Sequence, residues 1–372
     1  MPGLYIHIPF CIRKCRYCDF FSVPLSSPEA RQFLEALDRE CSTRPKDFAP
    51  DTVFVGGGTP TALSMDDLSR LFEVIHQRFN LDRVTEWTCE ANPGTLTREK
   101  AEALREAGVN RVSLGVQSFD AQTLAFLDRI HSPGEAKDAF QLLRDTGFTN
   151  VNLDLMYGIP GSPREVLERD LAQIVNLEPE HVACYCLIFE DGTPLTELRD
   201  AGKIAEVDDD EELAQYRLIR EVLQAAGYRH YEISNFAKPG FECRHNLLYW
   251  GGGEYLGYGP AAHSHWQGMR YGNMRSVSEY VRALRDWHRV RVDEERLDPE
   301  AKARETLVMS LRRLEGVSRE EFQRTTGFDY RALRGKEIDW LCQIGLVEFA
   351  GDALRLTDKG LFLSDAVFRE LV

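Results

Sequence analysis

Cys11-Ile12-Arg13-Lys14-Cys15-Arg16-Tyr17-Cys18 holds three of the nine cysteines of this 372-residue chain. The stretch comes just after residues 4–8, a β-rich run that we predict as the first strand. The tight Cys-x3-Cys-x2-Cys spacing lets three thiolates converge on a single small inorganic centre. The sequence therefore predicts a metal or cluster site immediately after the first strand.

The number of ligands separates the centres that these thiolates could hold. A structural zinc takes four ligands, and neither His7 nor Asp19, the nearest further donors, continues a known zinc spacing. A [4Fe–4S] cluster ordinarily takes four cysteines, so three would leave one iron open for a substrate. We therefore favour a cluster with one open iron. A zinc ion, and three reduced thiols without a metal, are the alternatives.

Composition excludes several classes of protein. The chain has 45 basic and 60 acidic residues and a net charge of −15, which disfavours general binding of nucleic acid, since that affinity comes from neutralised phosphates. The longest unbroken apolar run, residues 182–189, is far shorter than the ~20 residues that span a bilayer. No secretory signal is visible and the cysteine count is odd, so we expect a cytoplasmic protein without a disulfide framework.

Short β-rich runs alternate with amphipathic helical patterns in the first half. We predict strands at residues 4–8, 52–55, 85–89, 111–116, 150–155 and 182–188. We predict helices at residues 29–41, 98–107, 121–130, 136–145 and 165–176, and one capped by Ser64 whose apolar stripe runs from Leu68 to Phe79. This alternation implies parallel β/α units, in either an incomplete barrel or an open doubly wound sheet.

The alternation of strands and helices does not continue in the second half. The acidic cluster at residues 208–212 opens a helix to about Ala226, and the Gly- and aromatic-rich residues 235–271 are predicted to form a long ordered loop. From about residue 302 we expect three helices and a hairpin, as in a winged helix. The predicted parts are 1–200, a partial barrel; 201–300, a region that completes the barrel; and 301–372, a winged-helix-like domain.

Polar or glycine-rich signals follow successive predicted strands. They are Gly56-Gly57-Gly58-Thr59, Glu90-Ala91-Asn92-Pro93, Gly115-Val116-Gln117 and Asp154-Leu155-Met156-Tyr157-Gly158. In parallel β/α folds the C-terminal ends of the strands form the rim where ligands bind. We therefore expect these residues to form one site with the cysteine stretch.

These motifs, in this order, resemble those of the radical S-adenosylmethionine (SAM) superfamily, whose signature is Cys-x3-Cys-x-Tyr-Cys after a first strand. The resemblance covers nearly the whole chain and implies a partial (β/α)6 barrel of the α/β class. It implies that Cys11, Cys15 and Cys18 bind a [4Fe–4S] cluster. It also implies that Tyr17 flanks the adenine of SAM and that Tyr5 contacts SAM near the cluster.

The resemblance implies further contacts with SAM. Gly57, Gly58 and Thr59 would hold the methionine amino group through backbone groups that no side chain obstructs. Glu90 would bond a ribose hydroxyl or the amino group. The remaining SAM contacts implied by order and spacing are Gln117, Arg129 and Asp154. An arginine suits the SAM carboxylate, since a guanidinium can bind it through two parallel hydrogen bonds.

Within the superfamily the chain resembles the oxygen-independent coproporphyrinogen III oxidases and their relatives. The oxidases have a fourth cysteine where this chain has Phe20, and an N-terminal extension for which we expect no room before residue 11. The run His-Asn-Leu-Leu-Tyr-Trp at residues 245–250 is similar to the His-Asn-x-x-Tyr-Trp motif of HemW-type heme chaperones. This resemblance implies that His245 contacts heme. His263 and His265 are weaker candidates for a second ligand.

The resemblance thus implies a heme chaperone of the radical SAM fold that binds a [4Fe–4S] cluster, SAM and heme. Its partners would be heme-acceptor proteins of the respiratory type, with no nucleic acid and at most peripheral contact with a membrane. The main alternative is a radical enzyme that oxidises coproporphyrinogen III or a related tetrapyrrole. A winged-helix regulator with a cluster sensor is a third, disfavoured by the 12 basic and 12 acidic residues within 301–372.

Overall fold

The computed structural model describes residues 2–372. Six parallel strands form the centre of its sheet: β1 (Gly3–Ile8), β4 (Thr52–Gly57), β5 (Glu86–Ala91), β6 (Arg111–Gln117), β7 (Val151–Tyr157) and β8 (His181–Cys186). They lie side by side in chain order. All six predicted strands are confirmed, with slightly different bounds.

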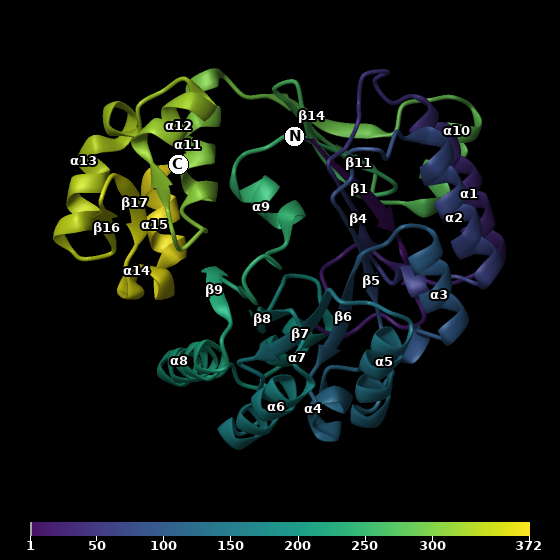
Figure 1. Cartoon of the computed structure of the whole chain (residues 1–372), viewed down its shortest axis with the longest axis horizontal. Helices are drawn as coiled ribbons and strands as arrows, with labels where there is room; N and C mark the ends of the chain where they lie inside the picture. The colour runs from purple at the N-terminus through teal and green to yellow at the C-terminus, as the bar shows by residue number, and fades with distance from the viewer. Residues whose placement is uncertain (1) are drawn as a thin grey trace.

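Helices connect these strands and cover one face of the sheet. They are α1 (Ser27–Ser42), α2 (Met65–Arg78), α3 (Arg98–Glu106), α4 (Ala121–Phe126), α5 (Pro133–Asp145) and α6 (Arg164–Leu177). The sheet is curved and these helices lie on its outer side (Figure 1). A doubly wound sheet reverses its strand order at a switch point, and this order does not reverse. Of the two predicted architectures, the incomplete barrel is therefore confirmed.

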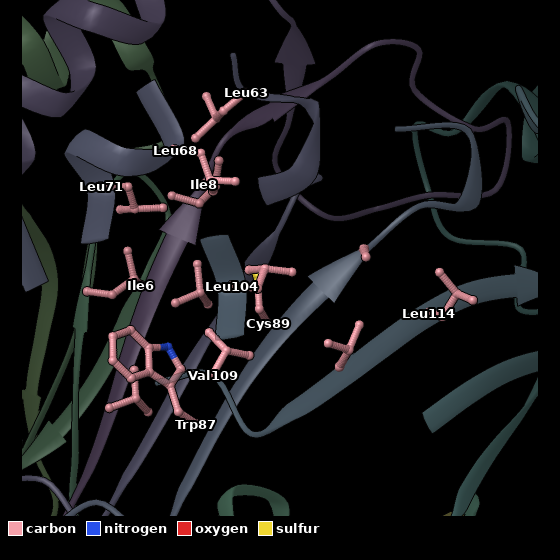
Figure 2. Close-up of a cluster of buried hydrophobic side chains, with 14 of the residues drawn as sticks. Ile6, Ile8, Leu63, Leu68, Leu71, Trp87, Cys89, Leu104, Val109 and Leu114 are labelled. Atoms are coloured by element: carbon pink, nitrogen blue, oxygen red, sulfur yellow. The ribbon is translucent and has the colours of Figure 1, made fainter. Parts of the chain in front are cut away.

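The core between sheet and helices is apolar. Figure 2 shows buried side chains in this core, among them Ile6, Ile8, Leu68, Leu71, Trp87 and Leu104. The predicted stripe from Leu68 to Phe79 is buried here because its spacing places it on one side of α2. Ser64 caps α2 as predicted: its Oγ accepts a hydrogen bond from Asp67 N (3.1 Å).

Further strands extend both edges of the barrel. Beside β1 lie β11 (Tyr255–Tyr258), which is parallel to it, and then the antiparallel β12 (His263–Trp266), β13 (Met269–Asn273) and β14 (Arg291–Arg296). Beside β8 lie β10 (Asn235–Ala237) and β9 (Arg229–Glu232). The helix α9 (Arg244–Trp250) lies between β10 and β11 in the chain. The prediction of a loop at residues 235–271 is therefore wrong, because these elements are too short to show a period.

The remaining elements before the C-terminal part are short, apart from the long helix α8. They are β2 (Phe10–Cys11), β3 (Val23–Pro24), the 3-10 turns η1 (Pro60–Ala62) and η2 (Pro93–Thr95), α7 (Pro194–Asp200), α8 (Asp209–Ala225) and α10 (Val277–Arg285). The helix α8 confirms the one predicted after the acidic cluster, and Asp208 caps it by accepting from Asp210 N (3.0 Å). In residues 2–372 we find no helix with the length and apolar character needed to cross a bilayer.

The C-terminal part has its own core. It contains α11 (Pro299–Ser310), α12 (Arg319–Thr326), α13 (Tyr330–Gln343), a hairpin of β16 (Val347–Ala350) and β17 (Ala353–Leu356), the short β15 (Val317–Ser318), α14 (Asp358–Phe362) and α15 (Ser364–Leu371). The predicted three helices and hairpin are confirmed. This part lies next to α9 (Figure 1), where the Arg312 guanidinium stacks over the Trp250 ring at 4.4 Å.

A buried carboxyl joins the first helix to the added strands. The side chain of Glu40, on α1, accepts hydrogen bonds from Gly259 N (2.8 Å), Asn273 Nδ2 (2.7 Å) and Tyr280 Oη (2.5 Å). Burial raises the pKa of Glu40 to about 7, although all three donors favour its charged form. One carboxyl thus connects α1 with β13 and α10, on the side of the sheet that extends beyond β1.

Candidate functional site

The C-terminal ends of the parallel strands and the cysteine loop enclose a cavity of about 430 Å³. Strand ends contribute Tyr5, Gly57 and Glu90, while the opposite wall contains His245, Tyr249 and His263. Residues 19–21, which follow Cys18 directly, form part of the rim of the cavity. Three of the predicted SAM contacts, Tyr5, Gly57 and Glu90, therefore line the same cavity as His245 and Tyr249 of the predicted heme motif.

The three cysteines lie half-buried on a loop that is fixed to its surroundings. Leu25 N donates to Cys11 O (2.9 Å), and Arg16 N donates to Leu127 O (3.4 Å). Burial raises the pKa of the Cys11 and Cys18 thiols, that of Cys18 to about 11, so these sulfurs need a metal to deprotonate them at neutral pH.

The donor chemistry of this loop fits an iron–sulfur cluster. Thiolates are the donors that such clusters take, and a cubane spreads its ligands over separate iron atoms.

Arg129, which follows α4, joins the cysteine loop to the strand ends. Its Nη1 donates to Cys15 Sγ (3.3 Å) and its Nη2 donates to Gly115 O (2.5 Å). Its Nε is buried without a hydrogen-bond partner in residues 2–372. With two of its five N–H groups bonded in this way, the guanidinium keeps donors for a further acceptor, such as the carboxylate predicted for it.

Two half-buried carboxyls lie on strands of the sheet that β6 separates: Glu90 on β5 and Asp154 on β7. Glu90 Oε2 accepts from Gly57 N (3.0 Å), and Asp154 Oδ1 accepts from Asn152 Nδ2 (2.6 Å). Burial raises the pKa of Glu90 to about 7, with a further contribution from the charge of Asp154, and burial raises the pKa of Asp154 to about 6. Glu90 lines the cavity and retains acceptor capacity for a hydroxyl or ammonium group.

The glycine turn after β4 is closely packed. Gly57 has φ +101°, and a Cβ there would lie 2.4 Å from the His7 ring. Gly58 N donates to Ile8 O (2.7 Å) and Thr59 N donates to Phe10 O (2.7 Å). An ammonium group only donates hydrogen bonds, so the turn would bind it through its carbonyl oxygens.

The sequence analysis did not assign a role to His7, although it lies two residues after Tyr5 and so on the same face of β1. Its Nε2 donates to Phe21 O (2.8 Å), and its Nδ1 accepts from Tyr5 Oη (3.0 Å). Burial lowers the pKa of His7 to about 4, so the ring is neutral and bridges the rim of the cysteine loop to Tyr5.

Tyr17 and Gln117 lie away from the cavity wall. Tyr17 packs on a small buried cluster that includes Leu127 and Met156. Gln117 is buried and has φ 69°, a left-handed conformation at the end of β6. Of the predicted SAM contacts, Tyr5, Gly57 and Glu90 line the cavity; those that do not line it are Tyr17, Gly58, Thr59, Gln117, Arg129 and Asp154.

His245 is held by hydrogen bonds at both ring nitrogens. Its Nδ1 bonds to Thr52 Oγ1 (2.8 Å) and its Nε2 bonds to Tyr249 Oη (2.7 Å). Glu86 fixes the start of α9, since its carboxylate accepts from Arg244 N (2.9 Å) and His245 N (3.0 Å). For His245 to bind iron, one of its ring bonds would have to break; otherwise its predicted contact with heme is through the ring on the cavity wall.

We expect His245→Ala to lower the free energy of unfolding by about 2 kcal/mol, because it leaves two buried hydroxyls without their partner. Denaturant titration of the full chain measures the change. His265→Ala is the matched control: His265 is half-buried and makes one weaker bond, Nδ1 to Gly253 O (3.2 Å), so its loss should be smaller. Equal losses in the two variants would contradict the structural role of His245.

Comparison with known proteins gives the class of this chain. The radical SAM superfamily matches residues 5–174, and the HemN C-terminal domain matches residues 297–363. The solved structure of coproporphyrinogen III oxidase (HemN) from Escherichia coli, a radical SAM enzyme, has the same fold, with a TM-score of 0.86 over 100% of this chain and 90% of that one at 22% identity. The fold is therefore that of the radical SAM superfamily.

The curated relatives are more similar in sequence. Heme chaperone HemW of Bacillus subtilis is 36% identical over 99% of this chain and 98% of its own length. Heme chaperone HemW of Escherichia coli is 37% identical over 97% of this chain and 96% of its own length. The chain belongs to the HemW family.

Proposed function

We propose that this protein is a cytoplasmic heme chaperone that holds a [4Fe–4S] cluster and SAM, binds heme and passes it to acceptor proteins of the respiratory type. One observation carries the proposal: a single cavity is lined by residues 19–21 next to the cysteine loop, by three of the predicted SAM contacts and by the helix α9 with its His-Asn-x-x-Tyr-Trp motif. The relatives, which are named heme chaperone HemW, support the same function.

In this proposal Cys11, Cys15 and Cys18 hold the cluster, and Arg129 places positive charge beside it. A reduced cluster of this kind supplies one electron to the sulfonium of SAM. The chain's own groups bind and orient SAM: Glu90 accepts from its hydroxyl or amino group, and the carbonyls of the glycine turn accept from the ammonium.

Heme would lie against the aromatic wall of the cavity. The Phe54 and His245 rings pack at a tilt of 34° with a centroid distance of 5.3 Å, and Tyr249 packs edge-on against Tyr255 at 4.5 Å. Phe20, in the position of the oxidases' fourth cysteine, is 69% exposed at the rim. A phenyl ring there cannot ligate iron but can contact the edge of a macrocycle that stays open to an acceptor.

The test compares two activities on one anaerobically reconstituted preparation. With SAM, a reductant and coproporphyrinogen III, we expect no protoporphyrinogen. After loading with hemin, we expect transfer to a heme-free cytochrome b, followed by its absorption spectrum, and no transfer when the chain is omitted. Formation of protoporphyrinogen would instead identify the radical enzyme considered above, and a chain that neither binds nor transfers heme would contradict the proposal.

We expect Gly57→Ala to weaken SAM binding roughly tenfold, because the new Cβ strains the backbone and displaces His7, which positions Tyr5. Equilibrium dialysis of SAM against the reconstituted protein measures this. Gly147→Ala is the control, since Gly147 has a similar φ of +87° but nothing lies within 4 Å of its Cβ position. SAM affinity equal to wild type in Gly57→Ala would remove the turn from the binding site.

A further inference from the structure

Three histidines line the cavity, and they differ in the hydrogen bonds that their ring nitrogens make. Both ring nitrogens of His7 are hydrogen-bonded, and so are both of His245. The ring of His263, the first residue of β12, is exposed and makes no hydrogen bond within residues 2–372. It is therefore the imidazole that can meet a ligand in this cavity without loss of an existing bond.

The sheet leaves room for this ring. His263 pairs with Gly272 on β13. A Cβ at Gly272 would lie 3.0 Å from Cε1 and 3.3 Å from Nδ1 of His263, so the imidazole packs on the backbone of a residue that has no side chain. The glycine thus determines where the ring rests at the cavity wall.

An arginine without an anionic partner lines the same cavity. Arg275 is exposed, and in the described part of the chain it forms no ion pair. Arg270, whose charge like that of Arg275 acts on His263, is by contrast paired with Glu295 (2.7 Å) and Glu305. In a chain of net charge −15, a free guanidinium at a cavity is suited to an anionic ligand.

We propose that His263 is the protein ligand of the iron of bound heme and that Arg275 binds one of its propionate groups. This inference rests on the proposed function, because it takes heme as the occupant of the cavity. Neutral imidazole is a common axial ligand of heme iron, and a guanidinium can bind a carboxylate through two hydrogen bonds. Two such contacts, one to the iron and one to a propionate, would together fix the orientation of heme in the cavity.

The test of the iron ligand is spectroscopic. Hemin is titrated into the full chain and into His263→Ala, and the axial ligand is read from the absorption and electron paramagnetic resonance spectra. We expect His263→Ala to lose the histidine-ligated spectrum and added imidazole to restore it. His265→Ala, two residues along the same strand, should keep the wild-type spectrum. A histidine-ligated spectrum that persists in His263→Ala overturns the assignment.

The test of the propionate contact uses hemin dimethyl ester, which lacks the carboxylates. We expect Arg275→Ala to bind hemin roughly tenfold or more weakly and to bind the ester as wild type does. Arg282→Ala, which removes an exposed arginine near Glu279, is the control and should leave both affinities unchanged. If Arg275→Ala loses the same factor for both ligands, the contact is not with a propionate. A wild-type chain that binds no hemin would instead contradict the proposed function itself.

Discussion

Replacement of Cys15 by alanine is expected to abolish the cluster. After anaerobic reconstitution, wild-type protein should contain about four iron and four sulfide ions per chain, and Cys15→Ala should contain less than about one. The physical reason is that two thiolates cannot hold a cluster that already has one iron without a protein ligand. The loss should be nearly complete because the nearest other group, Arg129, contacts Cys15 Sγ as a cationic donor and cannot ligate iron.

The control for this prediction is Cys342→Ala. Cys342 is a half-buried free thiol on α13, in the C-terminal part, so the same chemical change there should leave iron and sulfide unchanged. Metal analysis of wild-type protein discriminates further. Zinc in place of iron, or full iron and sulfide in Cys15→Ala, would contradict the assignment of the cysteine loop.

The strands of the barrel, though not its closure, could be predicted because they are buried on both sides. Residues of β4 and β6 such as Val53, Val55 and Leu114 are fully buried, and this gives short apolar runs that stand out between helical periods. The cysteine loop and the polar strand ends were found for a related reason: in parallel units each strand's C-terminal end meets the same rim. Local sequence therefore determined these features.

Residues 235–271 could not be predicted, because their structure depends on distant partners. The seven-residue helix α9 begins where Glu86, on β5, accepts its first N–H groups. Gly257 lies where a Cβ would be 2.2 Å from His263 O, so this glycine allows close packing of strands rather than a turn. Neither relation leaves a periodic signal in the sequence.

The shared cavity was unpredictable for the same reason. β11 pairs in parallel with β1, which brings Tyr255 beside Gly3 and carries His263 to the wall opposite Glu90. Likewise, the bonds that hold His245 come from Thr52 on another strand and from Tyr249 one helical turn away. The His-Asn-x-x-Tyr-Trp motif can be recognised in the sequence, but only the packing shows which ring nitrogens are already hydrogen-bonded.

The largest effect on stability is expected at Glu40. Glu40→Ala removes the acceptor of three buried donors, on Gly259, Asn273 and Tyr280, of which only Asn273 Nδ2 keeps another acceptor (Gly259 O, 2.9 Å), and we expect the free energy of unfolding to fall by about 3–5 kcal/mol. Denaturant titration measures this. Glu35→Ala on the exposed side of the same helix should change stability by less than about 0.5 kcal/mol. Similar losses in both variants would show that helix propensity, not the buried acceptor, sets the effect.

Glu40→Gln separates the charge of this carboxyl from its role as an acceptor. In the folded chain the pKa of Glu40 is raised by burial to about 7, above its ordinary value of 4.5. The folded state therefore binds more protons than the unfolded state between these pH values, and this group's contribution to stability is lost as the pH rises through that range. Glu90, Asp154 and Asp170 shift in the same direction, so the wild-type slope alone does not isolate Glu40. The difference in unfolding free energy between wild type and Glu40→Gln does isolate it: wild type should lose stability relative to the variant from pH 4.5 to pH 7, and a difference independent of pH would mean that Glu40 is already ionised throughout.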